Sequence, residues 1–316
     1  MDTTLSPAPP ELGYDQTVPR GLVHRWSLSE VFLTGYAGID GTVFACAAQL
    51  PLSHSYFRDH PEQREWYDPL NVLEAARQAV TYAAHVNQGV PRDTTFMVTA
   101  WSLEIIDAAA LACAERPGEL RIDGTVTDRR ERGGSVRLLA FAMDLSLGGQ
   151  RLGRLTMDVG CTPTDQYHLL RRMQRGTEVP TAFGLPAEAA GTPVPPHEVG
   201  RLDPVNAVLD DVVRAGDELT AVLSPRTFAN RSMYDHPYDH VPAMVLSEAA
   251  RQCALLLSAD GTWPRRVLRL DGQFRKFAEL DAPVTLAAAP AGPARAYRLI
   301  AQQGDATVAE IDLVLG

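Results

Sequence analysis

The sequence SMYDHPYDHVPAMVLSEAARQCALLL, residues 232–257, joins a polar segment with two histidines to a run of apolar residues. A related stretch, RDHPEQREWYDPLNVLEAARQAV, occurs earlier, at 58–80. Both stretches contain Asp-His-Pro, then a later proline, then Glu-Ala-Ala-Arg-Gln. The chain therefore repeats one pattern of loop and helix.

The spacing of the two copies indicates a duplicated domain. His236 follows His60 at an offset of 236 − 60 = 176, and Glu248 follows Glu74 at an offset of 248 − 74 = 174. A gap of two residues between the histidine and the glutamate therefore aligns the two copies. The upstream tripeptides VHR, at 23–25, and VGR, at 199–201, share the first of these offsets. A period of about 175 residues is too long for a solenoid repeat and fits two copies of one domain.

Each copy predicts a short approach strand, then one buried helix, then an antiparallel sheet. The helices, at 69–86 and 242–258, carry alanine or larger apolar residues on nearly every face, so a sheet has to wrap around each of them. Runs of alternating apolar and polar residues follow, which predict strands. In the first copy these runs are 96–106, 120–129, 135–147 and 150–162, and in the second they are 267–277, 283–290, 294–303 and 306–315. The pattern predicts an α+β fold, a double hotdog.

The expected domain organisation follows from the same pattern. It comprises a flexible N-terminal arm (1–20), a first hotdog repeat (21–179), a linker rich in proline, alanine and glycine (180–198), and a second hotdog repeat (199–316). Because one chain already contains two hotdogs, it is expected to act as a monomer or a homodimer.

Composition excludes several classes of function. The formal charge of −10 makes nucleic acid a poor partner, and no segment approaches the roughly 20 apolar residues of a membrane span. The N-terminus does not resemble a secretion signal, so a cytoplasmic location is expected. The sequence also lacks the glycine-rich and serine patterns of nucleotide-binding and serine-hydrolase sites, and no cofactor is expected.

A metal site is not expected either. The four cysteines are widely spaced and form no Cys-x-x-Cys pair, which argues against both zinc and disulfides. The segment DHPYDH offers two histidines and two aspartates, but Pro237 and Pro242 favour a loop, whereas this histidine spacing binds zinc when it lies on a helix.

Two glutamates inside the predicted helices are the first candidate site residues. Arg77 follows Glu74 at the i+3 position, and Arg251 follows Glu248 in the same way, so each pair lies on one helix face. A charged group on a buried helix is costly unless it is paired or functional. The alternative is a purely structural ion pair at the seam between the repeats.

Histidines and aspartates before the helices complete the candidate set. His60 and His236 precede their helices in both copies, and His240 has no counterpart in the first copy. Asp235 and Asp239, like Asp59 in the first copy, are placed to orient these imidazoles. The alternative is that the aspartates cap turns or helix starts and the histidines lie on the surface.

The sequence resembles the A-factor biosynthesis (AfsA-type) family, the γ-butyrolactone-precursor synthases. The segments that carry the resemblance are LVHRWSLSEVFLTG at 22–35, DPLNVLEAARQA at 68–79 and DHPYDHVPAMVLSEAARQ at 235–252. The resemblance implies transfer of a β-ketoacyl group from an acyl carrier protein to a hydroxyl of dihydroxyacetone phosphate. The product is the ester precursor of a butenolide or γ-butyrolactone signal that regulates antibiotic production.

The resemblance also implies roles for the candidate residues. Functional carboxylates carry over to Glu74 and Glu248 and a functional arginine to Arg251. In that chemistry Glu248 is expected as the base, with His236 or His240 as its competitor. Arg251, together with Arg77, is expected to bind the phosphate. His60, Asp235 and Asp239 are expected to support the site, and backbone N–H groups near the start of the second helix are expected to stabilise the oxyanion.

Two other functions remain open from sequence. A hotdog dehydratase, hydratase or thioesterase would use a histidine and an acid on an acyl thioester and would need no arginine for phosphate. A non-catalytic acyl-binding regulator would bind acyl groups even when Glu248 is replaced.

Overall fold

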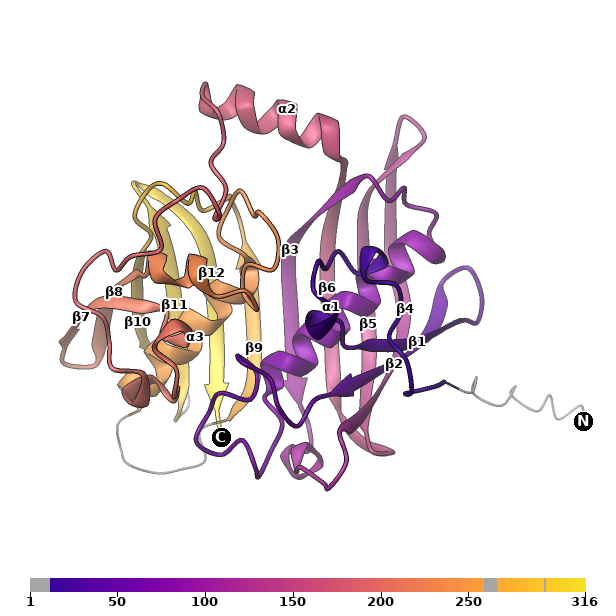
Figure 1. Cartoon of the computed structure of the whole chain (residues 1–316), viewed down its shortest axis with the longest axis horizontal. Helices are drawn as coiled ribbons and strands as arrows, with labels where there is room; N and C mark the ends of the chain where they lie inside the picture. The colour runs from indigo at the N-terminus through magenta and orange to yellow at the C-terminus, as the bar shows by residue number, and fades with distance from the viewer. Residues whose placement is uncertain (1–11, 259–265, 293) are drawn as a thin grey trace, which may run out of the picture.

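The computed structural model describes residues 12–258, 266–292 and 294–316. Within these residues the chain forms one antiparallel sheet of twelve strands, and one long helix lies on each half of it (Figure 1). Residues 1–11, most of the expected N-terminal arm, lie outside the described part.

The first half contributes six strands and the helix α1 (Pro69–Val86). Its strands are β1 (Leu33–Gly38), β2 (Val43–Leu50), β3 (Thr94–Ile105), β4 (Gly118–Arg132), β5 (Ser135–Leu147) and β6 (Gln150–Pro163). The second half contributes the helix α3 (Ala243–Leu257) and β7 (Leu209–Ala215), β8 (Glu218–Leu223), β9 (Val267–Phe274), β10 (Thr285–Pro290), β11 (Ala296–Gln303) and β12 (Ala306–Leu315). A third helix, α2 (Thr164–Arg175), connects the halves.

The strand order is the same in both halves when each is followed from the centre outward. The order is β1-β2-β4-β5-β6-β3-β9-β12-β11-β10-β8-β7, and the halves meet where β3 pairs with β9. Trp101 lies opposite Gly272 at this seam, where a Cβ on the glycine would come within 2.8 Å of the indole nitrogen. The structure confirms the predicted double hotdog, and the two hotdogs share one continuous sheet.

Local sequence explains the start of each long helix. Asp68 caps α1 by accepting a hydrogen bond from the backbone N–H of Leu70 at 2.9 Å, and Pro69 occupies the first helical position. At α3 the equivalent capping position holds Pro242, which provides no side-chain cap. The observed α1 has the predicted bounds, and α3 begins one residue later and ends one residue earlier than predicted.

The sheet has one covered face and one face open to solvent. Along β4, buried and exposed side chains alternate over most of the strand, as expected when only one face carries a helix. All eight predicted strand runs correspond to observed strands. Sequence reasoning expected one short approach strand per repeat, but a pair is present in each: β1 with β2, and β7 with β8.

The connection between the halves contains a helix that the sequence did not predict. In α2, Arg171 is almost fully buried and donates two hydrogen bonds to Glu279 of the second half, at 2.6 and 2.9 Å. We propose that residues 180–198, which follow α2, link the two hotdogs. Within this linker, Pro193 forms a single β-bridge with Asp210.

Candidate active site

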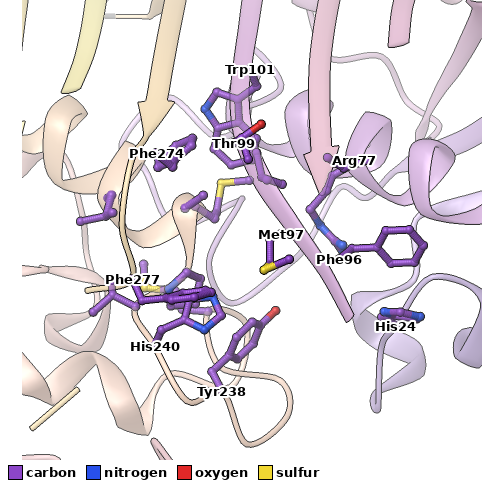
Figure 2. A pocket seen from close by; sticks show the side chains of 18 of the residues that line it. His24, Arg77, Phe96, Met97, Thr99, Trp101, Tyr238, His240, Phe274 and Phe277 are labelled. Atoms are coloured by element: carbon purple, nitrogen blue, oxygen red, sulfur yellow. The ribbon is translucent and has the colours of Figure 1, made fainter. Parts of the chain in front are cut away.

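A cavity of about 670 Å³ lies between the two halves. In Figure 2, Arg77, Phe96 and His24 of the first half lie across from Tyr238 and His240 of the second half. The polar side chains of the cavity wall include His24, Arg25, Glu74, Arg77, Arg171, His236, Tyr238, His240 and Glu279. The apolar side chains include Val80, Phe96, Met97, Val98, Trp101, Val159, Val241, Met244, Leu246, Phe274 and Phe277. The cavity can therefore hold a molecule with one charged and one apolar part.

A cluster of polar and charged side chains around Glu74, which lies on α1, forms part of the cavity wall and is called the α1 cluster. It consists of Glu74, Arg25, Arg77 and Gln78. Arg25 donates to the Glu74 carboxylate at 2.6 and 3.2 Å, and Arg77 donates to both of its oxygens at 2.8 Å. Gln78 adds a further hydrogen bond at 2.8 Å. Glu74, Arg25 and Arg77 all line the cavity.

The α1 cluster keeps Glu74 ionised. Burial by itself raises the pKa of Glu74, but the guanidinium groups of Arg25 and Arg77 outweigh this effect and lower the pKa to about 2. A carboxylate with this pKa is a weak proton acceptor at neutral pH. Its role in the geometry is to hold two arginines in place.

A matching cluster, the α3 cluster, surrounds the second glutamate. It consists of Glu248, Arg201, Arg251 and Gln252. Arg201 donates to Glu248 at 2.9 Å, Gln252 donates to it at 2.6 Å, and Arg251 completes the set. Tyr56 of the first half donates its hydroxyl to Glu248 at 3.0 Å. The two clusters are thus equivalent in residue types and layout.

The clusters differ in access to the cavity. Glu248 is fully buried, and neither it nor Arg251 is among the residues that line the cavity. Glu74 and Arg77 do line it. The structure therefore places the two residues expected to act as base and phosphate ligand, Glu248 and Arg251, inside the protein, and places their first-repeat equivalents on the cavity wall.

The clusters also differ in charge. In the α3 cluster, Arg251 donates to a second carboxylate, Asp68, at 2.8 Å, so two guanidiniums meet two carboxylates and the sum is 2 − 2 = 0. The position equivalent to Asp68 in the other half is 68 + 174 = 242, which is Pro242. The α1 cluster accordingly has two guanidiniums and one carboxylate, a sum of 2 − 1 = +1.

The aspartates of the two Asp-His-Pro motifs tie each half to the other. Asp235 accepts hydrogen bonds from the backbone N–H groups of Trp26 and Ser27, the latter at 2.9 Å. Asp59 accepts from the N–H groups of Leu202 and Asp203 at 3.1 to 3.3 Å. The two aspartates therefore cap turns, which is the alternative role expected from the sequence. Each one binds the segment that directly follows Arg25 or Arg201 in the other half.

The histidines separate into two groups. His236 and His240 line the cavity, and His240 is held through Nδ1 by Asp239 at 2.6 Å. His60 does not line the cavity and stacks on Trp66 with ring centroids 4.3 Å apart. Burial, more than any nearby charge, lowers the pKa of His60 to about 3. His60 is thus neutral and part of the packing.

Sequence reasoning missed four residues at these sites. Arg25 and Arg201 end the tripeptides VHR and VGR, whose spacing matched the repeat, so the duplication itself was a signal that they belong to the clusters. Tyr238, which accepts a hydrogen bond from Arg25 at 3.3 Å, and His24 carried no such signal. They are identified only by where the fold places them, on the wall of the cavity between the halves.

The described residues offer neither a metal site nor a membrane-spanning helix. Among them, no three or more His, Cys, Asp or Glu side chains are grouped to hold a metal ion. The cysteines are free thiols, and Cys46, Cys161 and Cys253 are buried. In the same part of the chain, none of the helices has the length and apolarity needed to span a membrane.

Comparison with known proteins decides the family. The model of the A-factor biosynthesis hotdog domain matches residues 8–163 and 186–314, one segment in each half. The chain belongs to the A-factor biosynthesis hotdog family. The resemblance expected from the motifs is thereby confirmed, and the family's two matched segments correspond to the two halves of the sheet.

Relatives within the A-factor biosynthesis family are similar over most of their length. A 2-oxo-3-(phosphooxy)propyl 3-oxoalkanoate synthase of Streptomyces virginiae is 33% identical over 92% of this chain and 95% of that protein. A synthase of the same name from Streptomyces coelicolor is 29% identical over 84% of this chain and 80% of that protein. Among solved structures, a dehydratase domain from the CurF module of curacin polyketide synthase matches at 11% identity, with a TM-score of 0.49 and coverage of 88% of this chain and 93% of that one.

Proposed function

We propose that this protein is a 2-oxo-3-(phosphooxy)propyl 3-oxoalkanoate synthase. It transfers a β-ketoacyl group from an acyl carrier protein to the hydroxyl of dihydroxyacetone phosphate. The ester formed is the precursor of a butenolide or γ-butyrolactone signal. The observation that carries the proposal is one cavity with a cationic wall and apolar walls, in a chain whose named relatives match it over most of its length.

The cationic wall fits the phosphate. Arg77 uses Nε and Nη2 to bind Glu74, and no residue of the described chain hydrogen-bonds to its remaining nitrogen, Nη1. With the net charge of +1 in the α1 cluster, this nitrogen is suited to donate to a phosphate oxygen. We therefore assign the phosphate to Arg77. We assign Arg251, whose Nη1 binds Asp68 and whose Nη2 binds Glu248, to holding the two halves together.

The apolar walls fit the acyl chain. Phe274, Phe277 and Met244 of the second half line the cavity together with Met97 and Trp101 of the first half. A β-ketoacyl chain buried there loses contact with water, which contributes about 0.8 kcal/mol for each methylene. Residues from both halves contribute to these walls. The length of the acyl chain that fits therefore depends on how the two halves pack against each other.

The transfer itself requires two proton movements. The hydroxyl oxygen of the acceptor attacks the thioester carbon, the C–S bond breaks, the hydroxyl proton passes to a base, and the thiolate of the carrier protein receives a proton. We assign proton transfer to His240, because its Nδ1 is fixed by Asp239 and its Nε2 remains for the substrate. His236, stacked on Tyr238 with centroids 4.0 Å apart, is its neighbour on the same wall.

The start of α3 fits the oxyanion. Ala243 and Met244 line the cavity at the first turn of α3, where Pro242 supplies no side chain to cap the free N–H groups. Such N–H groups and the helix dipole favour the negative charge that develops on the thioester oxygen.

The test is an incubation with a β-ketoacyl carrier-protein thioester, with and without dihydroxyacetone phosphate, followed by mass spectrometry. A phosphorylated ester or butenolide that forms only with the phosphate acceptor supports the proposal. Free acid would indicate a thioesterase, and an enoyl product would indicate a dehydratase. Acyl binding without turnover would indicate a regulator.

A further inference from the structure

His24 has a backbone conformation that favours glycine. Its φ is +53°, whereas the equivalent position in the second half, 24 + 176 = 200, is Gly200 with a φ of +69°. A non-glycine residue in this region is uncommon, and such strain concentrates at functional sites. His24 lines the cavity, whereas Gly200 does not. Of the two equivalent positions, the one at the cavity is therefore the one that carries a side chain.

A chain of hydrogen bonds fixes the tautomer of His24. The backbone carbonyl of Val90 lies 2.9 Å from Nδ1 of His85, and because a carbonyl only accepts, that Nδ1 carries the proton. Nε2 of neutral His85 is then an acceptor. It lies 2.9 Å from Nε2 of His24, which must therefore be the donor. The lone pair of His24 is left on Nδ1.

Both imidazoles are neutral, as this chain of hydrogen bonds requires. Burial, followed by repulsion from His85 and from the nearby arginines, lowers the pKa of His24 to about 3. Burial likewise lowers the pKa of His85. Within residues 12–258, 266–292 and 294–316, nothing donates a hydrogen bond to Nδ1 of His24. His24 is thus a fixed, uncharged hydrogen-bond acceptor.

The position of this acceptor relates it to the phosphate. Arg77 and Arg25, both in the α1 cluster, are close enough to repel a proton on His24, and Figure 2 shows His24 and Arg77 on the same side of the cavity, with Phe96 between them in this view. Phe96 also touches His24, with ring centroids 5.2 Å apart. An acceptor molecule whose phosphate binds Arg77 would present its other polar groups to His24.

We propose that His24 is a specificity-determining residue that accepts a hydrogen bond from the hydroxyl of the phosphorylated acceptor through Nδ1. This inference rests on the proposed function, because it takes the acceptor to be a small hydroxylated phosphate ester. His24 selects a substrate with a free hydroxyl a few bonds from the phosphate, since a ketone or ether oxygen has no proton to donate. It holds the hydroxyl in the bound acceptor, and the hydroxyl turns its proton from His24 to His240 when the oxygen attacks the thioester.

Binding measurements test this selection without any acyl donor. Calorimetry compares dihydroxyacetone phosphate with hydroxyacetone phosphate, in which a methyl group replaces the hydroxymethyl group and no free hydroxyl is left. The wild-type protein should bind the former about tenfold more tightly, the effect of one hydrogen bond. In His24→Gly the two affinities should become equal, and His24→Asn, whose amide oxygen replaces Nδ1, should restore much of the difference. Equal affinities in the wild-type protein would overturn the proposal.

The variant His24→Gly also separates function from folding. Since glycine relieves the positive φ, its melting temperature should equal or exceed that of the wild-type protein. A large loss of stability would mean that the side chain is structural, which would contradict the proposal.

Imidazole nitrogen NMR tests the tautomers directly. The proposal requires the proton on Nε2 in His24 and on Nδ1 in His85, and the opposite result overturns it. Because these spectra need no substrate, they are read even if no acyl transfer occurs. Failure of the transfer assay with the expected tautomers would refute the proposed reaction, and normal transfer with the wrong tautomers would refute the role of His24.

Discussion

Arg77 and Arg251 occupy equivalent positions in the two repeats, but of this pair only Arg77 lines the cavity. Arg251 is bound to two carboxylates, and Arg77 is bound to one. Duplication thus gave the protein two copies of a charged cluster, and a single difference at the opposite helix start, Asp68 in one half and Pro242 in the other, leaves one of them with an unbalanced positive charge.

Replacing Arg77 should weaken phosphate binding. In Arg77→Ala, the KM for dihydroxyacetone phosphate should rise about 10- to 100-fold, because one hydrogen bond to a charged group contributes roughly 1.5–3 kcal/mol. The matched control is Arg251→Ala, which breaks a buried ion pair and should lower the free energy of unfolding by about 3–5 kcal/mol. Steady-state kinetics and urea unfolding measure the two effects. An unchanged KM in Arg77→Ala would show that the phosphate does not bind at this wall of the cavity.

Supplying the missing carboxylate should neutralise the α1 cluster. Pro242→Asp places an acid where Asp68 stands in the other half, so Arg77 should gain a second carboxylate and phosphate affinity should fall. The new side chain also provides α3 with an N-cap, which stabilises a helix by about 1 kcal/mol. The melting temperature should therefore be maintained while calorimetry shows weaker binding of phosphate esters. Retained affinity would show that the net charge of the cluster does not attract the substrate.

Replacing His240 should reduce turnover. If it transfers the proton, His240→Gln should lower kcat about 10²- to 10⁴-fold with little change in the KM for the phosphate acceptor. His60→Gln is the matched control, because His60 is the histidine of the first Asp-His-Pro motif and lies outside the cavity. Its kcat should stay near that of the wild-type protein. Near-normal turnover by His240→Gln would shift the proton transfer to another group.

Stability should fall in acid as Glu74 becomes protonated. The pKa of Glu74 is lowered from 4.5 to about 2 in the folded protein, so the unfolded chain binds its proton first as the pH falls. The stabilisation is complete above pH 4.5 and is lost between there and pH 2, and a lowering of this size corresponds to about 3 kcal/mol. Urea unfolding across this range should show a smaller dependence on pH in Glu74→Gln than in the wild-type protein. Equal slopes would contradict the low pKa.

Periodicity and repetition in the chain were enough to predict the fold and its duplication. The helices of both repeats are apolar almost all round, and eight runs alternate with the period of a strand, which identified the buried helix and most of the sheet. The strands β1, β2, β7 and β8, of which one per repeat was expected, are short, and α2 has a strongly polar composition. These elements depend on pairing or on partners from the other half. The motifs also identified the family and both helix glutamates.

Packing between the halves selects which copy of the charged cluster faces the cavity. Glu74 and Glu248 lie in the same short motif, so no local pattern separates them. What separates them is that Asp68 reaches Arg251 across the interface, and that the loop with His236 and His240 meets the first half's cluster, forming the cavity there. His24 likewise became a candidate only when its backbone angle and its bond to His85 were known. Such properties arise from contacts between residues far apart in the chain, which periodicity and spacing do not encode.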